Sequence, residues 1–308
     1  VMLTALLQFV LTEKVVSIKA PWGVSWGDPS CPPVLLCAGR MQPCTAFRPL
    51  VHLLPSSFHY VAIDLPGNGW SDHLPKGLKF TVYDLVPTFV RVMEYLKWEK
   101  FMFIGHSLGS YVGKYFMMAY PGRITRAVIL DPIPAYHTIT AARMGAWYHE
   151  FYGDYYTDDK YAKFNGPPET APKYSYEQVR KMFISVQGLT EEAVDHILER
   201  SIEPAGDGLY RLTYDQRMKQ VPEMPFPPSY VKELYTGLKV PLFTILAKAV
   251  VDRGIYDAVP FIRDESAWPN KNYRVKIVEG THDVHLINPK CMAEDISKFL
   301  LAEAKSKL

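Results

Sequence analysis

The sequence predicts an α/β fold in which a mostly parallel sheet is flanked by helices and interrupted by a helical lid insertion. In the first half of the chain, short and continuous apolar runs alternate with amphipathic stretches. This pattern is typical of parallel strands that are covered on both faces. From residue 132 to residue 238 the chain becomes polar, aromatic and mostly helical, and apolar strands then resume. We therefore expect a core of residues 1–131 and 239–308 and a cap of residues 132–238.

The periodicity of apolar residues locates the individual elements. Continuous apolar runs predict buried strands over residues 33–37, 60–64, 101–105, 127–130, 240–247 and 273–278. Helical spacing predicts helices over residues 82–98, 110–120, 174–186 and 190–202, with a last helix after residue 289. In open α/β sheets, ligands bind along the edge formed by the carboxyl ends of the strands. The lid is therefore expected to cover that edge.

Composition excludes several functional classes. The 308 residues carry a net charge of +2 without a basic block, which argues against a nucleic-acid partner. The four cysteines have neither the spacing of metal ligands nor that of a disulfide framework: Cys31, Cys37, Cys44 and Cys291. We expect no metal and no organic cofactor.

The motif Gly105-His106-Ser107-Leu108-Gly109 directly follows a predicted strand and directly precedes a predicted helix. That context identifies a nucleophile elbow, a sharp turn that presents a serine hydroxyl at the sheet edge. A side chain at either glycine of the motif is expected to collide with the neighbouring strand or helix. Ser107 is therefore the candidate nucleophile.

A serine hydroxyl needs a base to take its proton, and in this arrangement the base is a histidine after the last strand. The loop that follows residue 278 contains two histidines, His282 and His285. His282 is the preferred candidate because it lies at the tip of the loop, nearest the strand. His285 is expected to shape the pocket.

Two carboxylates compete to orient this histidine. Asp131 follows the strand at residues 127–130, and Asp252 follows the strand at residues 240–247. The chain order of serine, acid and histidine permits both. Asp252 follows the strand that usually carries the acid in this arrangement. However, four further residues separate Asp252 from the end of that strand. We favour Asp131, whose alternative role is to cap the turn at Pro132.

The oxyanion of the reaction requires two backbone donors. One is expected to be the N–H of Leu108, the residue after the nucleophile. The other is expected from the loop after the first buried strand, where Arg40 is the candidate.

These motifs resemble the α/β-hydrolase superfamily and, within it, the serine hydrolase-like proteins, which are peroxisomal α/β-hydrolases of animals. The resemblance covers about residues 13–303 and rests on the elbow and on six further segments: 20–23, 64–72, 96–98, 214–217, 280–282 and 282–285. It implies a serine hydrolase with Ser107 as nucleophile and His282 as base. It also implies that the family has only a weak version of the usual acidic turn after residue 247. This favours Asp131 as the acid over Asp252.

The sequence departs from the family pattern in the loop after the first buried strand. Relatives carry His-Gly followed by an acidic residue, whereas this chain has Ala38-Gly39-Arg40. Asn68 likewise replaces a frequent histidine. The missing histidine normally supports the oxyanion loop, so its loss is expected either to weaken that loop or to reshape it for an unusual substrate.

Two functions are therefore compatible with the sequence. The first is hydrolysis of an apolar ester or thioester through a Ser-His-Asp triad and an acyl-enzyme, with lid aromatics lining an apolar pocket: Trp147, Tyr148, Phe151, Tyr152, Tyr155 and Tyr156. These residues serve equally well as the core of the lid. The alternative is a ligand-binding or sensor protein on a partly decayed hydrolase fold, motivated by the altered loop at Ala38.

The two ends of the chain carry further signals. The apolar run at residues 1–11 is shorter than the roughly 20 residues that span a bilayer, so we expect it to pack on the core and predict no membrane span. The last three residues, Ser306-Lys307-Leu308, form the address for peroxisomal import. They predict the import receptor as a partner and the peroxisome as location.

Overall fold

The computed structural model of the chain describes residues 14–17, 22–133, 139–222 and 226–302. Eight strands form one sheet in the order β1-β2-β4-β3-β5-β6-β9-β10. Their bounds are Lys14–Ser17, Trp22–Trp26, His59–Ile63, Pro33–Cys37, Phe101–His106, Ile124–Leu130, Leu242–Ala247 and Tyr273–Val278, in that order. The pairs from β4 to β10 are parallel, whereas β2 pairs antiparallel with β1 and β4. The mostly parallel sheet is as predicted.

The strands at Pro33–Cys37 and Tyr273–Val278 match their predicted bounds, and the other predicted strands differ by a few residues. The helix expected over residues 82–98 is instead divided. A 3-10 helix at Val82–Leu85 begins with a capping box, and α2 then starts anew at Pro87 and ends at Leu96. Proline has no N–H to donate, so it is favoured at the first turn of a helix and disfavoured inside one.

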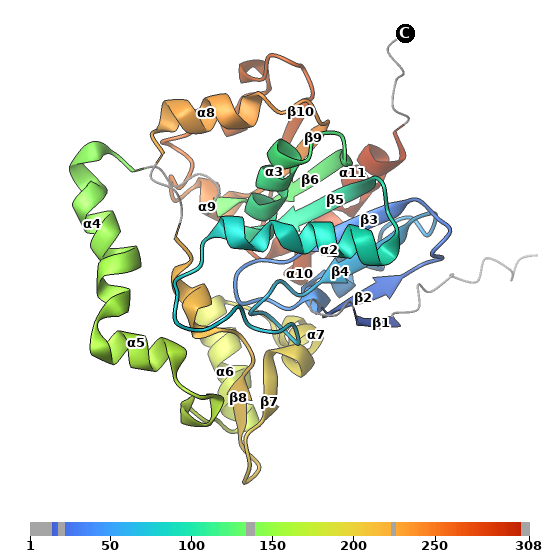
Figure 1. Ribbon diagram of the computed structural model, residues 1–308. Helices are drawn as coiled ribbons and strands as arrows, with labels where there is room; N and C mark the ends of the chain where they lie inside the picture. The colour runs from blue at the N-terminus through green and yellow to red at the C-terminus, as the bar shows by residue number, and fades with distance from the viewer. Residues whose placement is uncertain (1–13, 18–21, 134–138, 223–225, 303–308) are drawn as a thin grey trace, which may run out of the picture.

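Helices lie on both faces of the sheet. In Figure 1, α2 and α3 lie in front of the sheet and α11 lies behind it. The helices of the core have the bounds α1 Arg48–Val51, α2 Pro87–Leu96, α3 Leu108–Ala119, α8 Pro228–Thr236, α9 Lys248–Val251, α10 Val284–Ile287 and α11 Lys290–Leu301. The central strands β3, β4 and β5 are almost wholly buried, as their continuous apolar sequences predict.

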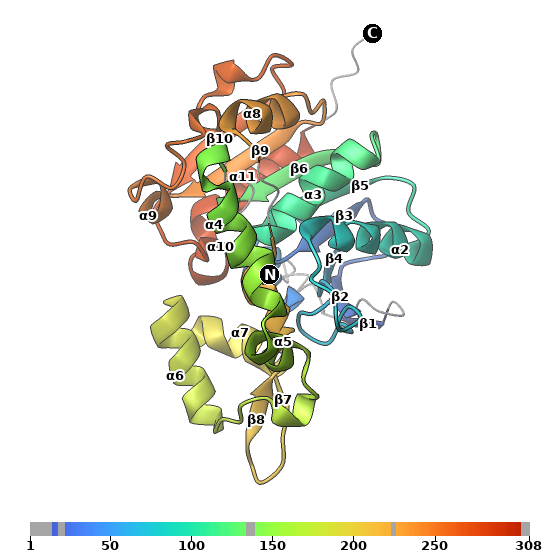
Figure 2. The same ribbon diagram turned by 60° about the vertical axis from the view of Figure 1, so that its left-hand side comes forward.

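The inserted segment forms a separate group of elements beyond the sheet (Figures 1 and 2). Its helices are α4 Met144–Tyr148, α5 Asp158–Asn165, α6 Tyr176–Gln187 and α7 Glu191–Ser201. A hairpin of β7 (Ile202–Pro204) and β8 (Tyr210–Leu212) follows, which the sequence analysis did not anticipate. The helix α8 falls inside the predicted cap, yet its Val231 and Tyr235 belong to the larger hydrophobic core.

The candidate site residues follow parallel strands that end at one edge of the sheet. The segments after β3, β4, β5, β6, β9 and β10 all leave the sheet at its carboxyl end, because these strands are parallel neighbours. Ser107, Asp131 and His282 are on three of these segments. No helix in the described part of the chain has the length and apolar character needed to cross a membrane.

Candidate active site

Ser107 lies in a strained turn between β5 and α3. Its backbone angles are φ 49° and ψ −120°, a combination that residues with a side chain rarely adopt. A Cβ at Gly105 would lie 2.6 Å from the Phe103 ring, and one at Gly109 would lie 2.2 Å from the carbonyl oxygen of Cys37. Both glycines are therefore required by the close approach of α3 to the sheet. The strain is held in place by this packing.

Asp131 and His282 lie in direct contact. The Nδ1 atom of His282 is 2.6 Å from Oδ2 of Asp131. The other carboxylate oxygen of Asp131 accepts a hydrogen bond from the Ala247 N–H at 3.0 Å and from the Tyr256 hydroxyl at 2.8 Å. Asp131 is buried, whereas the His282 side chain is 29% exposed. The carboxylate is thus held on one side by two donors and faces the imidazole on the other.

Asp252, the alternative acid, points elsewhere. It forms an ion pair with Lys248 one helical turn earlier, with 2.5 Å between Nζ and Oδ2, and its side chain is 58% exposed. No sequence motif identifies Tyr256, which donates to Asp131. Its position in a turn nine residues after β9 carries no signal by itself; only the fold brings it to the carboxylate.

His285, the alternative base, is fully buried and packs against the rings of Phe47 and His106. Its ring centroid lies 5.2 Å from that of Phe47 and 4.0 Å from that of His106. Neither ring nitrogen has a hydrogen-bond partner within the described residues. Burial, aided by the nearby His282, lowers the pKa of His285 to about 3, so the ring is neutral.

The loop after β3 packs directly against the nucleophile. A Cβ on Gly39 would lie 3.1 Å from the Cβ of Ser107. Asn68 holds this loop at two points: its Nδ2 donates to the Gly39 carbonyl at 3.1 Å, and its Oδ1 accepts from the Met41 N–H at 3.1 Å. Asn68 therefore supports the loop after β3, although it lies about thirty residues away from Ala38, where relatives carry the histidine.

The two predicted oxyanion donors lie in segments next to Ser107: Leu108 follows it in the chain, and Arg40 follows Gly39, whose added Cβ would lie 3.1 Å from the Ser107 Cβ. Leu108 is the first residue of α3, and the carbonyl of Ser107 accepts from the N–H groups of Ser110 and Tyr111. Arg40 lies in the turn between Gly39 and Met41, and its exposed side chain donates to the carbonyl of Lys219 in the inserted segment at 2.8 Å. This contact ties the loop to the cap.

A second polar cluster is built around His106, the residue before Ser107. His106 bonds through Nδ1 to Gln42 and through Nε2 to the carbonyl of His282, both at 3.0 Å, and Gln42 contacts the carboxyl of Asp283. His106, Asp283 and His285 also place potential metal-ligating atoms within 4.8 Å of one another. However, both ring nitrogens of His106 already have hydrogen-bond partners, the Gln42 side chain and the His282 carbonyl. The cluster is therefore better described as a hydrogen-bond network than as a metal site.

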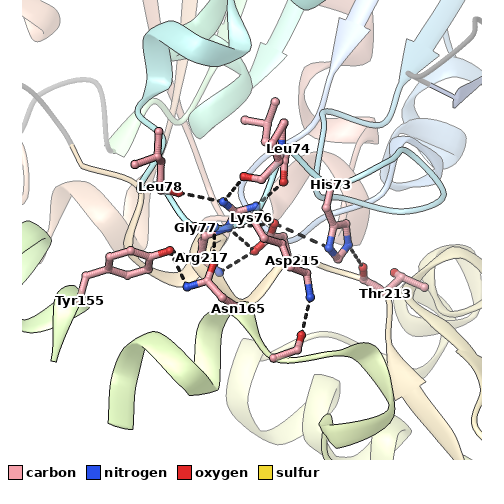
Figure 3. Close-up of polar contacts among 12 residues, drawn as sticks. His73, Leu74, Lys76, Gly77, Leu78, Tyr155, Asn165, Thr213, Asp215 and Arg217 are labelled. Atoms are coloured by element: carbon pink, nitrogen blue, oxygen red, sulfur yellow. Dashed lines mark hydrogen bonds and ion pairs between the residues drawn. The ribbon is translucent and has the colours of Figure 1, made fainter. Parts of the chain in front are cut away.

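The cap is fastened to the core by polar contacts with residues 73–78 (Figure 3). Arg217 is buried, pairs with Asp215 at 2.7 Å, and donates to the carbonyls of Leu74, Pro75 and Leu78. Asn165 accepts from the N–H of Gly77 at 2.8 Å. The segment 214–217, which carried part of the family resemblance, thus has a structural role.

The aromatic residues of the cap divide between the two roles proposed for them. Tyr155 is fully buried and stacks on Phe164, and Trp147 is 8% exposed. By contrast, Tyr148 and Tyr156 are each about half exposed. The buried members are packing residues of the cap, and the ligand role remains a prediction for the exposed ones.

Comparison with known proteins agrees with this architecture. The sequence profile described as alpha/beta hydrolase fold matches residues 32–225. A "Serine hydrolase-like protein" of Danio rerio is 29% identical over 92% of this chain and 87% of its own length. "Serine hydrolase-like protein 2" of Homo sapiens is 26% identical over 92% of both chains.

Solved structures show the same fold at low sequence identity. A hypothetical protein from Pseudomonas aeruginosa has a TM-score of 0.72, with 22% identity over 94% of this chain and 97% of that protein. An esterase from Mycobacterium tuberculosis has a TM-score of 0.70, with 18% identity over 95% of this chain and 93% of that one.

Proposed function

Because the chain belongs to the alpha/beta hydrolase fold family, we propose that it is a serine hydrolase that cleaves carboxylic esters or thioesters through Ser107, His282 and Asp131. A single observation supports this assignment above all others. The buried carboxylate of Asp131 lies 2.6 Å from Nδ1 of His282, on the same sheet edge that carries the strained Ser107. The family and its relatives already make the chain a hydrolase; the residues and the bond that is cleaved are our proposal.

In the first half of the reaction, His282 takes the proton of the Ser107 hydroxyl while Oγ attacks the acyl carbon of the substrate. Asp131 holds the imidazole in the tautomer that leaves Nε2 free to accept, and it stabilises the imidazolium that forms. The tetrahedral intermediate then collapses, the bond to the leaving oxygen or sulfur breaks, and the imidazolium protonates the leaving group. An ester of Ser107 remains.

In the second half, water gives a proton to His282 and adds to the acyl carbon. Collapse of the second tetrahedral intermediate breaks the bond to Oγ, which regains its proton from the imidazolium. The N–H groups of Leu108 and Arg40 are proposed to hold the oxyanion in both halves. Backbone donors tolerate changes of side chain, so an arginine is compatible with this role.

A substrate with an apolar acyl or alcohol part is supported by the exposed aromatics of the cap, such as Tyr148 and Tyr156. Among structures of similar fold are an esterase from Mycobacterium tuberculosis and a "Thioesterase Domain From Curacin Biosynthetic Pathway". No basic cluster in the sequence suits the phosphates of coenzyme A, so a plain ester is the preferred substrate.

The hypothesis of a decayed site rested on the altered loop at Ala38. That loop is held by Asn68 and packs against Ser107, so no observation now favours a sensor over an enzyme. Covalent labelling of Ser107 distinguishes the enzyme hypothesis from the sensor hypothesis.

The proposal is tested with a fluorophosphonate probe and intact-mass analysis. We expect one adduct on the wild-type protein and none on Ser107→Ala, while the distant control Ser297→Ala labels like the wild type. A panel of p-nitrophenyl esters of graded chain length, with acyl-CoAs alongside, then ranks esters against thioesters. A folded wild-type protein that forms no adduct and cleaves none of these substrates would return the sensor hypothesis to first place.

A further inference from the structure

The end of strand β5 and two loops carry the residues of the proposed mechanism. One buried series of hydrogen-bonded polar side chains joins these three segments. His106, immediately before Ser107, contacts the His282 carbonyl through Nε2 and Gln42 through Nδ1, each at 3.0 Å. Gln42, in the loop after β3, contacts the carboxyl of Asp283, the neighbour of the base. All three side chains are nearly inaccessible: His106 is 1%, Gln42 is 6% and Asp283 is 8% exposed.

The hydrogen positions in this series follow from counting donors. A carbonyl oxygen only accepts, so Nε2 of His106 must carry a hydrogen in order to bond to His282. A neutral imidazole then has only a lone pair at Nδ1. Nδ1 lies 3.0 Å from the position assigned to the amide oxygen of Gln42, which is a second acceptor. Such a pair of acceptors repels rather than binds.

Two arrangements remove this conflict, and they contain the same number of protons. In the first, His106 is an imidazolium that donates at both nitrogens, and Asp283 is an ionised carboxylate. In the second, the Gln42 amide is turned so that its NH₂ faces Nδ1 and its oxygen faces Asp283, and Asp283 keeps the proton. The oxygen and nitrogen of an amide are similar in shape, so both orientations fit the same space.

The surroundings favour the second arrangement. An ion pair here would need two charges in a site without solvent, which is costly. Burial, together with His285 and His282, lowers the pKa of His106 well below its ordinary value. Burial likewise raises the pKa of Asp283, and the nearby Asp131 carboxylate acts in the same direction, while His282 and Gln42 oppose it.

We propose that Asp283 is a neutral carboxylic acid that donates to the oxygen of Gln42, that Gln42 donates to Nδ1 of His106, and that His106 donates to the carbonyl of His282. We call this the neutral chain. It rests on the function proposed above and assigns Gln42, His106 and Asp283 as positioning residues for the catalytic base. Every hydrogen bond in it has one donor and one acceptor, and no member carries a charge.

The neutral chain has two consequences for catalysis. First, it holds the backbone of the loop that carries His282 against the end of β5 and against the loop after β3. Second, it places no negative charge of Asp283 beside His282, whose Nδ1 contacts the carboxyl of Asp131. An ionised Asp283 next to His282 would stabilise the imidazolium further and raise the pKa of the base.

Infrared spectroscopy tests the protonation of Asp283 without any need for activity. The difference spectrum of wild type minus Asp283→Asn at pH 7 should contain the C=O stretching band of a protonated carboxyl. The matched control Asp252→Asn, which removes an exposed carboxylate, should show only the loss of carboxylate bands. A spectrum for Asp283→Asn that resembles the control would overturn the proposal.

The wild-type protein provides a second measurement, which does not depend on the folding of a variant. With ¹⁵N-labelled histidine, the neutral chain predicts a His106 ring protonated at Nε2 and unprotonated at Nδ1 at neutral pH. A ring protonated at both nitrogens identifies the ion pair and contradicts the proposal. Both spectroscopic results stand even if the protein hydrolyses no ester, so failure of the proposed function is separable from failure of the neutral chain.

Kinetics test the positioning role. The rate of fluorophosphonate labelling against pH reports the pKa of His282, whose charged or titratable neighbours are Asp131, Asp283, His106 and His285. Asparagine can donate as the carboxylic acid does, so Asp283→Asn should label within about twofold of wild type, with an unchanged acid-side pKa. Gln42→Leu leaves Nδ1 of His106 unpaired and should label about tenfold more slowly, a rate loss equivalent to one hydrogen bond. An acid-side pKa that falls in Asp283→Asn means that the wild-type carboxyl is ionised, which contradicts the neutral chain.

Discussion

At the scale of single residues, the site depends on which carboxylate faces His282. Asp131 is buried and receives hydrogen bonds from the Ala247 N–H and the Tyr256 hydroxyl, which keep its second oxygen turned toward Nδ1. Asp252 lies in solvent and pairs with Lys248. A solvated carboxylate is screened and acts only weakly on a distant imidazole. The two residues therefore differ in environment as much as in position.

We expect Asp131→Asn to lower kcat on the order of 10⁴-fold, as the corresponding change does in another serine hydrolase, because the amide favours the wrong tautomer of the base. Steady-state hydrolysis of a p-nitrophenyl ester measures this. The control Asp252→Asn should stay close to wild type. The opposite ranking would transfer the role of the acid to Asp252, and equal small losses would mean that neither carboxylate is coupled to His282.

At the scale of elements, two short segments would present the reacting groups of the proposed mechanism. The elbow depends on the close approach of α3 to β3, where Gly109 has no room for a side chain. The loop after β3, which we propose as the oxyanion loop, is held by Asn68, whose amide bonds to it at Gly39 and at Met41. In both cases a small or polar residue holds backbone groups in a conformation that the local sequence does not favour on its own.

Gly109→Ala should destabilise the protein by about 1–3 kcal/mol, the usual cost of overpacking, because its Cβ would meet the Cys37 carbonyl at 2.2 Å. Urea unfolding measures the change. Gly145 in α4 provides the matched control, because a Cβ added there would have nothing within 4 Å. Gly145→Ala should be neutral or stabilising by about 0.5–1 kcal/mol. Equal effects of the two substitutions would show that α3 can move away from the sheet at little cost.

Asn68→Ala should lower kcat about tenfold with little change in KM, since the loop loses both of its hydrogen bonds to this side chain. Ester hydrolysis measures the effect, and Asn270→Ala, which loses a bond to the distant Leu238 carbonyl, serves as control. Wild-type turnover in Asn68→Ala would mean that other contacts suffice to hold the oxyanion loop.

At the scale of the whole molecule, buried arginines join the cap to the core. Arg217 binds three carbonyls of residues 73–78 and pairs with Asp215 (Figure 3). Arg200 of α7 lies 3.5 Å from Asp64, and both side chains are almost inaccessible. Such pairs are costly to break, because the remaining partner keeps an uncompensated buried charge. We infer that the cap unfolds together with the core rather than ahead of it.

Arg217→Met should therefore reduce the free energy of unfolding by about 3–5 kcal/mol. The exposed pair of Lys298 and Glu294 provides the contrast, and Lys298→Met should change stability by less than about 0.5 kcal/mol. Urea unfolding followed by tryptophan fluorescence measures both. A loss for Arg217→Met no larger than that of the control would mean that the cap docks through its apolar contacts alone.

Peroxisomal import through Ser306-Lys307-Leu308 stays a prediction, because these residues lie outside the described part of the chain. The address is read by a receptor at the free carboxyl end. A protein tagged at its N-terminus should colocalise with peroxisomes and lose that distribution when the three residues are deleted. An unchanged distribution would contradict the prediction. The apolar run at residues 1–11 also lies outside the described residues.

The sequence by itself determined the fold class and the elbow; it favoured His282 and Asp131 as partners of Ser107 but left Asp252 open as the acid. These depend on local patterns: continuous apolar strands, and glycines two residues on either side of a serine between a strand and a helix. Tertiary structure alone decided the contacts between distant loops. Tyr256 reaches Asp131, Asn68 holds the loop after β3 that lacks the family histidine at position 38, and Gln42 joins His106 to Asp283. Each contact joins segments far apart in the chain, so no spacing or periodicity encodes it. It exists because parallel strands bring their carboxyl ends to one edge, where side chains without a local signal meet in a site closed to water.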